Sequence, residues 1–462
     1  MPKRIATLLA TLFFAVAAAT QATAQAQRSV VIILMDSLRP DHLQTYGYGR
    51  ATSPNILAFS RRATVFEQAY PSASWTRPSI LSLLTGRYSS ELTTNLGGGS
   101  PLKDGHPTLA TVLRSWKYTT AAFYNTAQLA PAAANAQAGF DTYVDYGSTK
   151  YVEANVAQGV DKTIEFLRAA RKPAFIFLHV LDPHHPYIPT RDYFGKVPTR
   201  KYLDSYSFAT GIPAYHPDKV DPCYVVKNMS TVPEMVELYD SEIRELDTEV
   251  GRLLRYLDED KRYRDALVII TSDHGEEFGE HGGLFHGARF YEESLRVPLI
   301  IRDPNYPSSI GRRVPSVVSL VDVLPTILSL TGISYPESAY SGRSLLLYFT
   351  RRTPPPRETV IVEKPGCGFD ATASVRKGPW KMIIRITRPK IELYDLQADP
   401  GEKKDLSGSK AANVRRAYID LYGTFETWYR TVNRPLATRN GDVTPPLPPE
   451  LRERLKALGY LQ

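Results

Sequence analysis

The stretch Ala266-Leu-Val-Ile-Ile-Thr-Ser-Asp-His-Gly275 decides the fold, because it passes directly from a buried strand into metal-binding side chains. Residues 266–272 are mostly apolar or β-branched, which predicts a strand buried on both faces. Asp273 and His274 follow at its carboxyl end, and they are a hard and a borderline metal ligand. In open α/β sheets, ligands bind outside the carboxyl ends of the strands.

Similar apolar runs alternate with helical patterns along the chain. Further buried strands are predicted at residues 30–35, 119–123, 174–180 and 297–302. Apolar residues recur every three or four positions over residues 232–257, which predicts one long amphipathic helix. The alternation predicts an α/β fold with a mainly parallel central sheet flanked by helices. Asp36, Asp182 and Asp273 each fall at the carboxyl end of a predicted strand.

The composition changes after Arg343. The basic, proline-rich residues 351–357 predict a linker, and residues 189–233 predict a loop over the site. The segments that follow the linker predict a small antiparallel sheet and then a helix: residues 359–364, 373–386, 392–396 and 413–431. The expected organisation has three parts: a signal peptide (1–24), a catalytic domain (25–345) and a C-terminal α+β subdomain (346–462).

The N-terminus has the three parts of a secretory signal peptide: Met1-Pro-Lys-Arg4, the uncharged residues 5–19, and Ala22-Thr-Ala24. The alternative is an uncleaved anchor, although the apolar stretch is short for a membrane span. We therefore expect a secreted or periplasmic protein with no stable membrane anchor after cleavage. Cys223 and Cys367 leave a single disulfide open, since sequence cannot say whether they meet.

The formal net charge of the 462-residue chain is +8 and is scattered, which suits a small anionic substrate. No nucleic-acid motif is present, so we expect no nucleic-acid partner. The oligomeric state is left open.

A second segment, Ser74-Trp-Thr-Arg-Pro-Ser-Ile-Leu-Ser-Leu-Leu-Thr-Gly-Arg87, carries the candidate nucleophile. Thr76 lies two residues before Pro78, and proline is tolerated in a first helical turn. We therefore expect Thr76 at or beside a helix N-terminus, where an anion is favoured. Together with Asp273 and His274, this predicts a metal-activated nucleophile for phosphate or sulfate esters. The alternative role of Thr76 is a helix N-cap.

These motifs resemble those of the sulfatase family of the alkaline phosphatase superfamily, in order, from about residue 30 to residue 462. The motifs are Asp36-Ser-Leu-Arg-Pro-Asp41, Thr52-Ser-Pro-Asn55, Thr76-Arg-Pro-Ser79, Asp182-Pro-His-His-Pro-Tyr187, Ser272-Asp-His-Gly-Glu-Glu-Phe-Gly-Glu280, Phe285-His-Gly287, Leu295-Arg-Val-Pro298, Arg376-Lys-Gly-Pro-Trp-Lys381 and Glu392-Leu-Tyr-Asp-Leu396. The resemblance implies an ester hydrolase with the alkaline phosphatase/sulfatase fold.

The chain departs from that family where the chemistry is decided. Sulfatases carry Cys or Ser, oxidised to formylglycine, and an Arg four residues later; here these positions hold Thr76 and Ile80. Oxidation of Thr would give a ketone, so formylglycine cannot form. A phosphorylated Thr can be hydrolysed by in-line water at phosphorus, whereas a sulfated Thr would need direct attack at sulfur. The departure resembles the threonine-nucleophile phosphodiesterases and phosphoethanolamine or phosphoglycerol transferases.

The implied metal site holds one or two divalent ions. Asp36, Thr76, Asp273 and His274 are the expected ligands, and the imidazole moves the expected ion from calcium, which stays open, towards zinc or manganese. Asp182 either joins a second metal site or braces its turn. His286, at the spacing of a functional histidine in the transferases, is either part of that second site and of catalysis or a surface residue.

The remaining site candidates follow from the same resemblance. The family pattern His-x-Pro favours His184 over His185 as a catalytic histidine. Asn125 lies near the position of the substrate-binding lysine of sulfatases, and Arg77 and His185 are further candidates for substrate contact. The expected activity is phosphate mono- or diester hydrolysis, with sulfate esters or phosphonates as further substrates. The alternatives are an arylsulfatase-like enzyme, a transferase, and a binding protein that keeps the fold without catalysis.

Overall fold

The structure is a computed structural model. It describes residues 28–92, 101–147, 156–171, 173–185, 187–191, 193–194, 232–351, 359–364, 372–386 and 390–440, with side chains up to residue 431. The predicted signal peptide, most of the predicted linker, residues 195–231 of the predicted loop, Cys223 and Cys367 lie outside the described residues.

A central sheet of eight strands has the order β10-β2-β9-β6-β1-β5-β3-β4. The strands are β1 (Val30–Met35), β2 (Thr64–Tyr70), β3 (Thr119–Tyr124), β4 (Thr142–Asp145), β5 (Ala174–Val180), β6 (Leu267–Ser272), β9 (Val297–Arg302) and β10 (Arg313–Ser319). Strand β9 runs antiparallel to its neighbours β2 and β6, and the other pairs are parallel. The predicted mainly parallel sheet is confirmed.

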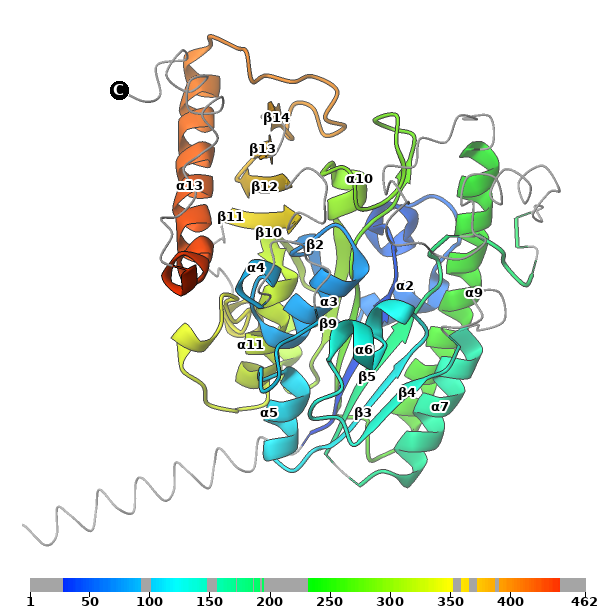
Figure 1. The fold of residues 1–462 in the computed structure, drawn as a ribbon. Coiled ribbons are helices and arrows are strands. Elements are labelled where there is room, and N and C mark those ends of the chain that lie inside the picture. The colour runs from blue at the N-terminus through cyan, green and yellow to red at the C-terminus, as the bar shows by residue number, and fades with distance from the viewer. Residues whose placement is uncertain are drawn as a thin grey trace, which may run out of the picture.

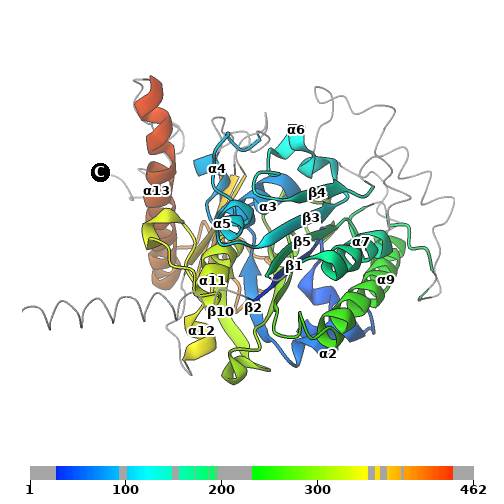
Figure 2. The same cartoon turned by 90° about the horizontal axis from the view of Figure 1, so that it is seen from below.

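Helices cover both faces of this sheet (Figure 2). Because side chains alternate along a strand, β1 contributes to two cores. Val30, Ile32 and Leu34 pack with α3, α5 and α11, whereas Val31 and Ile33 pack with α2, α7 and α9. The helices are α2 (Pro54–Ser60), α3 (Thr76–Thr85), α5 (Leu109–Ser115), α7 (Val156–Ala169), α9 (Val232–Glu259) and α11 (Val323–Leu330).

The predicted long helix and all five predicted central strands are present, but the sequence did not indicate β2, β4 and β10. Each lacks the uniform apolar run that marked the others. Strand β2 has Glu67 and Gln68 in its middle, β4 is a short, largely half-buried edge strand, and β10 contains Pro315 and partly exposed residues.

A second, antiparallel sheet in the order β11-β12-β13-β14 lies beyond the β10 and β2 edge, with α13 along it (Figure 1). Its elements are β11 (Thr359–Lys364), β12 (Thr372–Lys377), β13 (Trp380–Arg385), β14 (Lys390–Asp395) and α13 (Ala412–Asn440). The predicted single segment 373–386 is therefore a hairpin, which turns at Gly378 with φ 57°. Glycine adopts this left-handed conformation without a steric penalty.

Short elements complete the fold. They are α4 (Ser89–Leu92), α6 (Pro131–Ala134), α10 (Glu292–Leu295), α12 (Leu347–Thr350), β7 (Glu277–Phe278), β8 (Leu284–Phe285), η1 (Pro40–His42), η2 (Gln44–Tyr46), η3 (Ala127–Leu129), η5 (Pro307–Ser309), η6 (Leu320–Asp322) and η7 (Glu337–Ala339). Phe349 of α12 packs in the core of the central sheet, so the chain contributes to that core as far as residue 349.

A buried lysine links the C-terminal sheet to the central domain. Lys381 of β13 is fully buried and pairs with Glu292 of α10 at 3.0 Å and with Glu402 at 2.9 Å. Burial alone would lower the pKa of Lys381, but these two carboxylates raise it above its ordinary value. The lysine therefore stays charged and anchors the C-terminal sheet to the central domain.

Lys381→Ala is expected to reduce the free energy of unfolding by about 3–5 kcal/mol, because it leaves the buried carboxylate of Glu402 without its cation. The matched control is Lys377→Ala on the adjacent strand. It removes a partly exposed ion pair with Asp420 and should cost at most about 1 kcal/mol. Denaturant titration of both variants measures the difference, and equal losses would contradict the role given to Lys381.

Candidate functional site

The hydroxyl of Thr76 points at the strand-end motifs and not at its own helix. Thr76 is the first residue of α3, and Trp75 precedes it as the N-cap in extended conformation without a side-chain capping bond. Thr76 Oγ1 lies 3.5 Å from Asp36 Oδ2 and 3.3 Å from His274 Nε2. The prediction of a helix N-terminus is confirmed, and the hydroxyl is directed to the two candidate metal ligands.

Parallel pairing of β1 with β6 brings Asp36 and Asp273 together. Met35 is directly opposite Ser272, so the residues that follow leave the sheet side by side. Asp273 Oδ1 accepts hydrogen bonds from the backbone N–H groups of Ser37 at 3.2 Å and His274 at 2.9 Å. Asp36, Asp273 and His274 are fully buried, and their ligand atoms lie within 4.8 Å of one another.

The electrostatics of this group favour a bound cation. Burial and the charge of Asp36 raise the pKa of Asp273 to about 7. Burial alone would also raise the pKa of Asp36, but the charges of His184 and other nearby histidines bring it below its ordinary value. Burial lowers the pKa of His274, which keeps its imidazole neutral. Among the described residues, Asp273 Oδ2 is buried without a hydrogen-bond partner.

Two carboxylates and a neutral imidazole therefore fit a divalent metal. The donor set is intermediate in hardness, as zinc and manganese sites are, and calcium sites use oxygen ligands alone. The unpartnered oxygen of Asp273 supplies a ligand position that no other group in the described structure uses.

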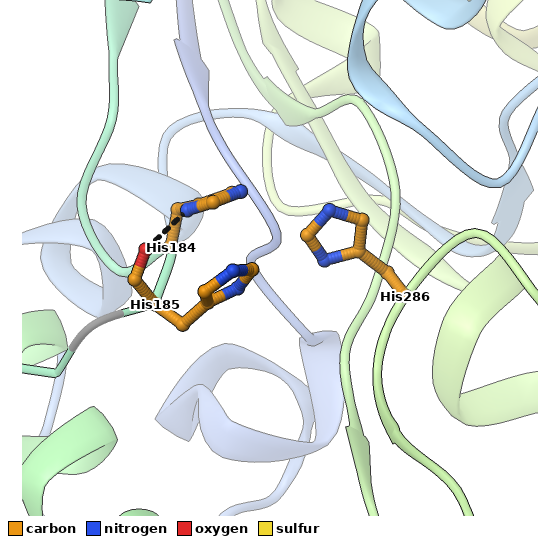
Figure 3. A group of neighbouring side chains, drawn as sticks. All are labelled: His184, His185 and His286. Carbon is orange, nitrogen blue, oxygen red and sulfur yellow. Dashed lines mark hydrogen bonds between the residues drawn. The ribbon is translucent and has the colours of Figure 1, made fainter. Parts of the chain in front are cut away.

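Three histidines form a second group beside the first (Figure 3). His184 and His185 lie on the loop after β5, and their rings stack with centroids 4.1 Å apart. His286 follows β8, and its ring centroid is 4.9 Å from that of His184 and 4.2 Å from that of His274. One nitrogen from each of the three lies within 4.8 Å of the others, so this group is also suited to hold an ion.

Strained backbone positions flank both groups. Ser37 follows Asp36 with φ 58°, and Phe285 precedes His286 with φ 67°. Residues other than glycine rarely adopt these left-handed angles, and such strain concentrates at functional sites.

Glu276, which the sequence analysis did not single out, lies against two of the three histidines, His286 and His185. Its Oε1 accepts a hydrogen bond from His286 Nδ1 at 2.9 Å, and its Oε2 accepts one from Tyr187 at 2.9 Å. His185 Nδ1 lies 3.8 Å from Oε2. Burial would raise the pKa of Glu276, but His286 and His185 lower it below its ordinary value. Its position two residues after His274 was the signal available in the sequence.

His179 is the other residue that the sequence analysis missed. It lies on β5, is fully buried, and places Nε2 3.3 Å from Asp36 Oδ2 without a well-formed hydrogen bond. A lone polar residue near the end of an otherwise apolar strand was its only signal.

The remaining candidates are Asp182, Asn125 and Arg77. Asp182 belongs to neither; loss of solvent and the charge of Glu245 raise its pKa to about 7. Asn125 is fully buried, and its Oδ1 accepts a hydrogen bond from the Leu181 N–H at 2.8 Å. Arg77 donates to Gln128 at 2.7 Å. Its guanidinium carbon is 6.0 Å from the centre of the Trp75 ring.

The fold and motifs agree with known proteins. A family model described as Sulfatase matches residues 28–333. This chain belongs to the sulfatase family. A second model, for the C-terminal part of N-sulphoglucosamine sulphohydrolase, matches residues 279–419 of this sulfatase-family chain. The resemblance to the sulfatase family that the motifs predicted is therefore confirmed.

Similar proteins include hydrolases of more than one ester class. Arylsulfatase K of Mus musculus is 30% identical over 281 residues, which cover 54% of this chain and 50% of that protein. The chain thus spans about half the length of this curated relative. A solved complex of BT4656 with its substrate D-glucosamine-2-N,6-O-disulfate has a TM-score of 0.70 at 20% identity, covering 88% of this chain and 98% of that one. The phosphonate monoester hydrolase of Agrobacterium radiobacter has a TM-score of 0.66 at 20% identity, covering 87% of this chain and 96% of that one. At such identity the solved structures establish the fold alone.

Asp273→Ala and His274→Ala are each expected to lose bound metal and nearly all turnover, because each removes one of three buried ligands. Mass-spectrometric metal analysis of the purified variants measures the loss. His281→Asn is the control, since His281 bonds to Glu293 outside both ligand groups and should keep the wild-type content. Wild-type metal content in both site variants would contradict the proposed ligands.

Proposed function

We propose that this sulfatase-family enzyme hydrolyses phosphate mono- or diesters, with Thr76 as its nucleophile. The observation that supports this most directly is the hydroxyl of Thr76, at the N-terminus of α3, in contact with both Asp36 and His274. A threonine cannot be converted to formylglycine, so the route by which sulfatases expel sulfate is closed to it. Ile80 supports the same proposal, since it packs in the core and offers no positive charge to a sulfate.

Asp36, Asp273, His274 and the Thr76 oxygen would hold a divalent metal, with zinc or manganese favoured. When bound, such an ion lowers the pKa of a coordinated hydroxyl and neutralises the oxygens of the ester. The same donor groups orient the hydroxyl: the Asp36 carboxylate accepts its hydrogen bond, and the buried His274 ring holds it from the other side.

In the proposed first step, Thr76 attacks as the alkoxide, its hydroxyl proton having passed to solvent beforehand, and Oγ1 forms a bond to phosphorus while the bond to the leaving oxygen breaks. A proton from His184 or His286 passes to that leaving oxygen. In the second step, water attacks phosphorus, the bond to Thr76 breaks, and the water proton returns to the histidine. Asn125, Arg77 and His185 are proposed to contact the substrate on the far side of the transferred group.

The second candidate function is sulfate-ester hydrolysis, which the 30% identity to an arylsulfatase favours. Both classes present a tetrahedral anionic group, so the same site can bind either. The difference lies in the release of the covalent intermediate, which is feasible at phosphorus and slow at sulfur.

Phosphate esters are expected to be hydrolysed with a higher kcat/KM than sulfate esters that carry the same aryl leaving group. Thr76→Ala should lower kcat/KM by at least about 1,000-fold, since covalent catalysis and metal positioning fail together. Thr76→Ser keeps the hydroxyl and should retain part of the activity. Quenched-flow trapping should find the transferred group on Thr76.

Two results would contradict this assignment. A clear preference for the sulfate ester would favour the arylsulfatase-like alternative. Full activity in Thr76→Ala would exclude this residue as the nucleophile, whichever ester is preferred.

We further propose that the protein is exported and cleaved after Ala24, before Gln25. The described part of the chain contains no helix long and apolar enough to cross a membrane. Mass spectrometry of protein from its native host should find a chain that begins near Gln25. Recovery of an intact Met1 terminus would contradict cleavage.

A further inference from the structure

Glu276 is a buried carboxylate that contacts His286 and His185 of the histidine group. It is fully buried and accepts hydrogen bonds from His286 Nδ1 and from the Tyr187 hydroxyl, each at 2.9 Å. We propose that Glu276 is the positioning residue of His286, and that this pair delivers the proton to the leaving oxygen. This proposal depends on the proposed function in one respect, namely that a histidine gives the proton to the leaving oxygen.

The carboxylate of Glu276 is fixed from several sides. Tyr187, itself fully buried, donates to Oε2, and Arg39 Nη1 donates to the backbone carbonyl of Glu276 at 3.0 Å. Strand β7 begins at the next residue and pairs with β8, which leads directly to His286. Both partners of the bond are therefore mounted on one small hairpin, which holds their separation constant.

This bond decides which nitrogen of His286 meets the substrate. Glu276 occupies Nδ1, and Ser37 Oγ lies 3.5 Å from the same atom. Nε2 is then the nitrogen that remains, and the proposal assigns it to the substrate and not to an ion held by the three histidines. The ring also lies against that of His274, with centroids 4.2 Å apart, and His274 contacts the Thr76 hydroxyl. The proton donor is thus one ring away from the nucleophile.

His184 is held differently. Its Nδ1 bonds to the neutral backbone carbonyl of the next residue, His185, at 2.5 Å. A hydrogen bond to a carboxylate is roughly twice as strong as one between neutral groups. The carboxylate-backed ring of His286 is therefore the better-positioned donor. As Thr76 Oγ1 bonds to phosphorus and the leaving oxygen departs, the proton on His286 Nε2 moves to that oxygen.

A proton donor matters for a poor leaving group and hardly matters for a good one. The test therefore compares a methyl ester with a 4-nitrophenyl ester of the same acid, in whichever ester class the wild-type enzyme hydrolyses faster. Glu276→Gln should lower kcat for the methyl ester by about 100-fold and for the 4-nitrophenyl ester by less than about 10-fold. The metal content should remain that of the wild type.

The matched control is Glu277→Gln. Glu277 is the next residue, equally buried, and pairs with Arg289 and Ser294. If Glu277→Gln lowers kcat at all, it should do so by the same factor for the methyl ester and for the 4-nitrophenyl ester. Tyr187→Phe, which frees Glu276 Oε2, should reproduce the selective loss in weaker form. Equal losses for both esters in Glu276→Gln would mark a merely structural role and overturn the proposal.

A double-mutant cycle makes the same distinction without reference to the leaving group. If Glu276 acts through His286, Glu276→Gln should add no further loss of kcat in a His286→Ala background. Additive losses, or non-additivity with His184→Ala in place of His286→Ala, would overturn the pairing. If sulfate proves the preferred ester, the proposed function fails while this comparison remains decisive.

Discussion

The parallel pairing of β1 with β6 is the constraint on which the site depends. It sets Asp36 and Asp273 side by side at the carboxyl edge of the sheet, in a fully buried position. Two carboxylates there repel each other and have lost their water, so the pair is costly unless a cation or a proton compensates it. The large apolar cores on both faces of the sheet stabilise the fold enough to sustain this arrangement.

Helix α3, which carries the proposed nucleophile, is held at the same strand ends. Ser79, one turn into α3, donates from Oγ to the backbone carbonyl of Asp273 at 2.7 Å. Ile80 then inserts into the core, so α3 has little freedom to move. The Thr76 hydroxyl is consequently placed by the packing of a whole helix and not by a mobile loop. Such placement is what covalent catalysis needs, because small displacements of a nucleophile are expensive.

The sequence predicted those elements that a local pattern of apolar residues marks. The apolar run ending in Asp273 and His274 predicted both a central strand and a metal site, and the strand is confirmed. Edge strands such as β4 were missed because they lack that run. Asp182 also follows a central strand but belongs to neither ligand group, and its alternative role of bracing the turn stays a prediction. Glu276 was missed because its role depends on contacts made in the folded protein, with His286 and with Tyr187, which is 89 residues away in the chain.

In the proposed function, the side chain of Thr76 decides between phosphate and sulfate esters. Phosphate and sulfate esters are both tetrahedral anions, and under the proposed function the ligand groups, the helix N-terminus and the histidines would bind either. Binding is thus shared across the family, while turnover depends on how the covalent intermediate breaks down. A threonine ester has no aldehyde hydrate to expel the acid, so water must reach the central atom directly. Because in-line attack is feasible at phosphorus, the proposed preference for phosphate esters depends on the threonine at position 76.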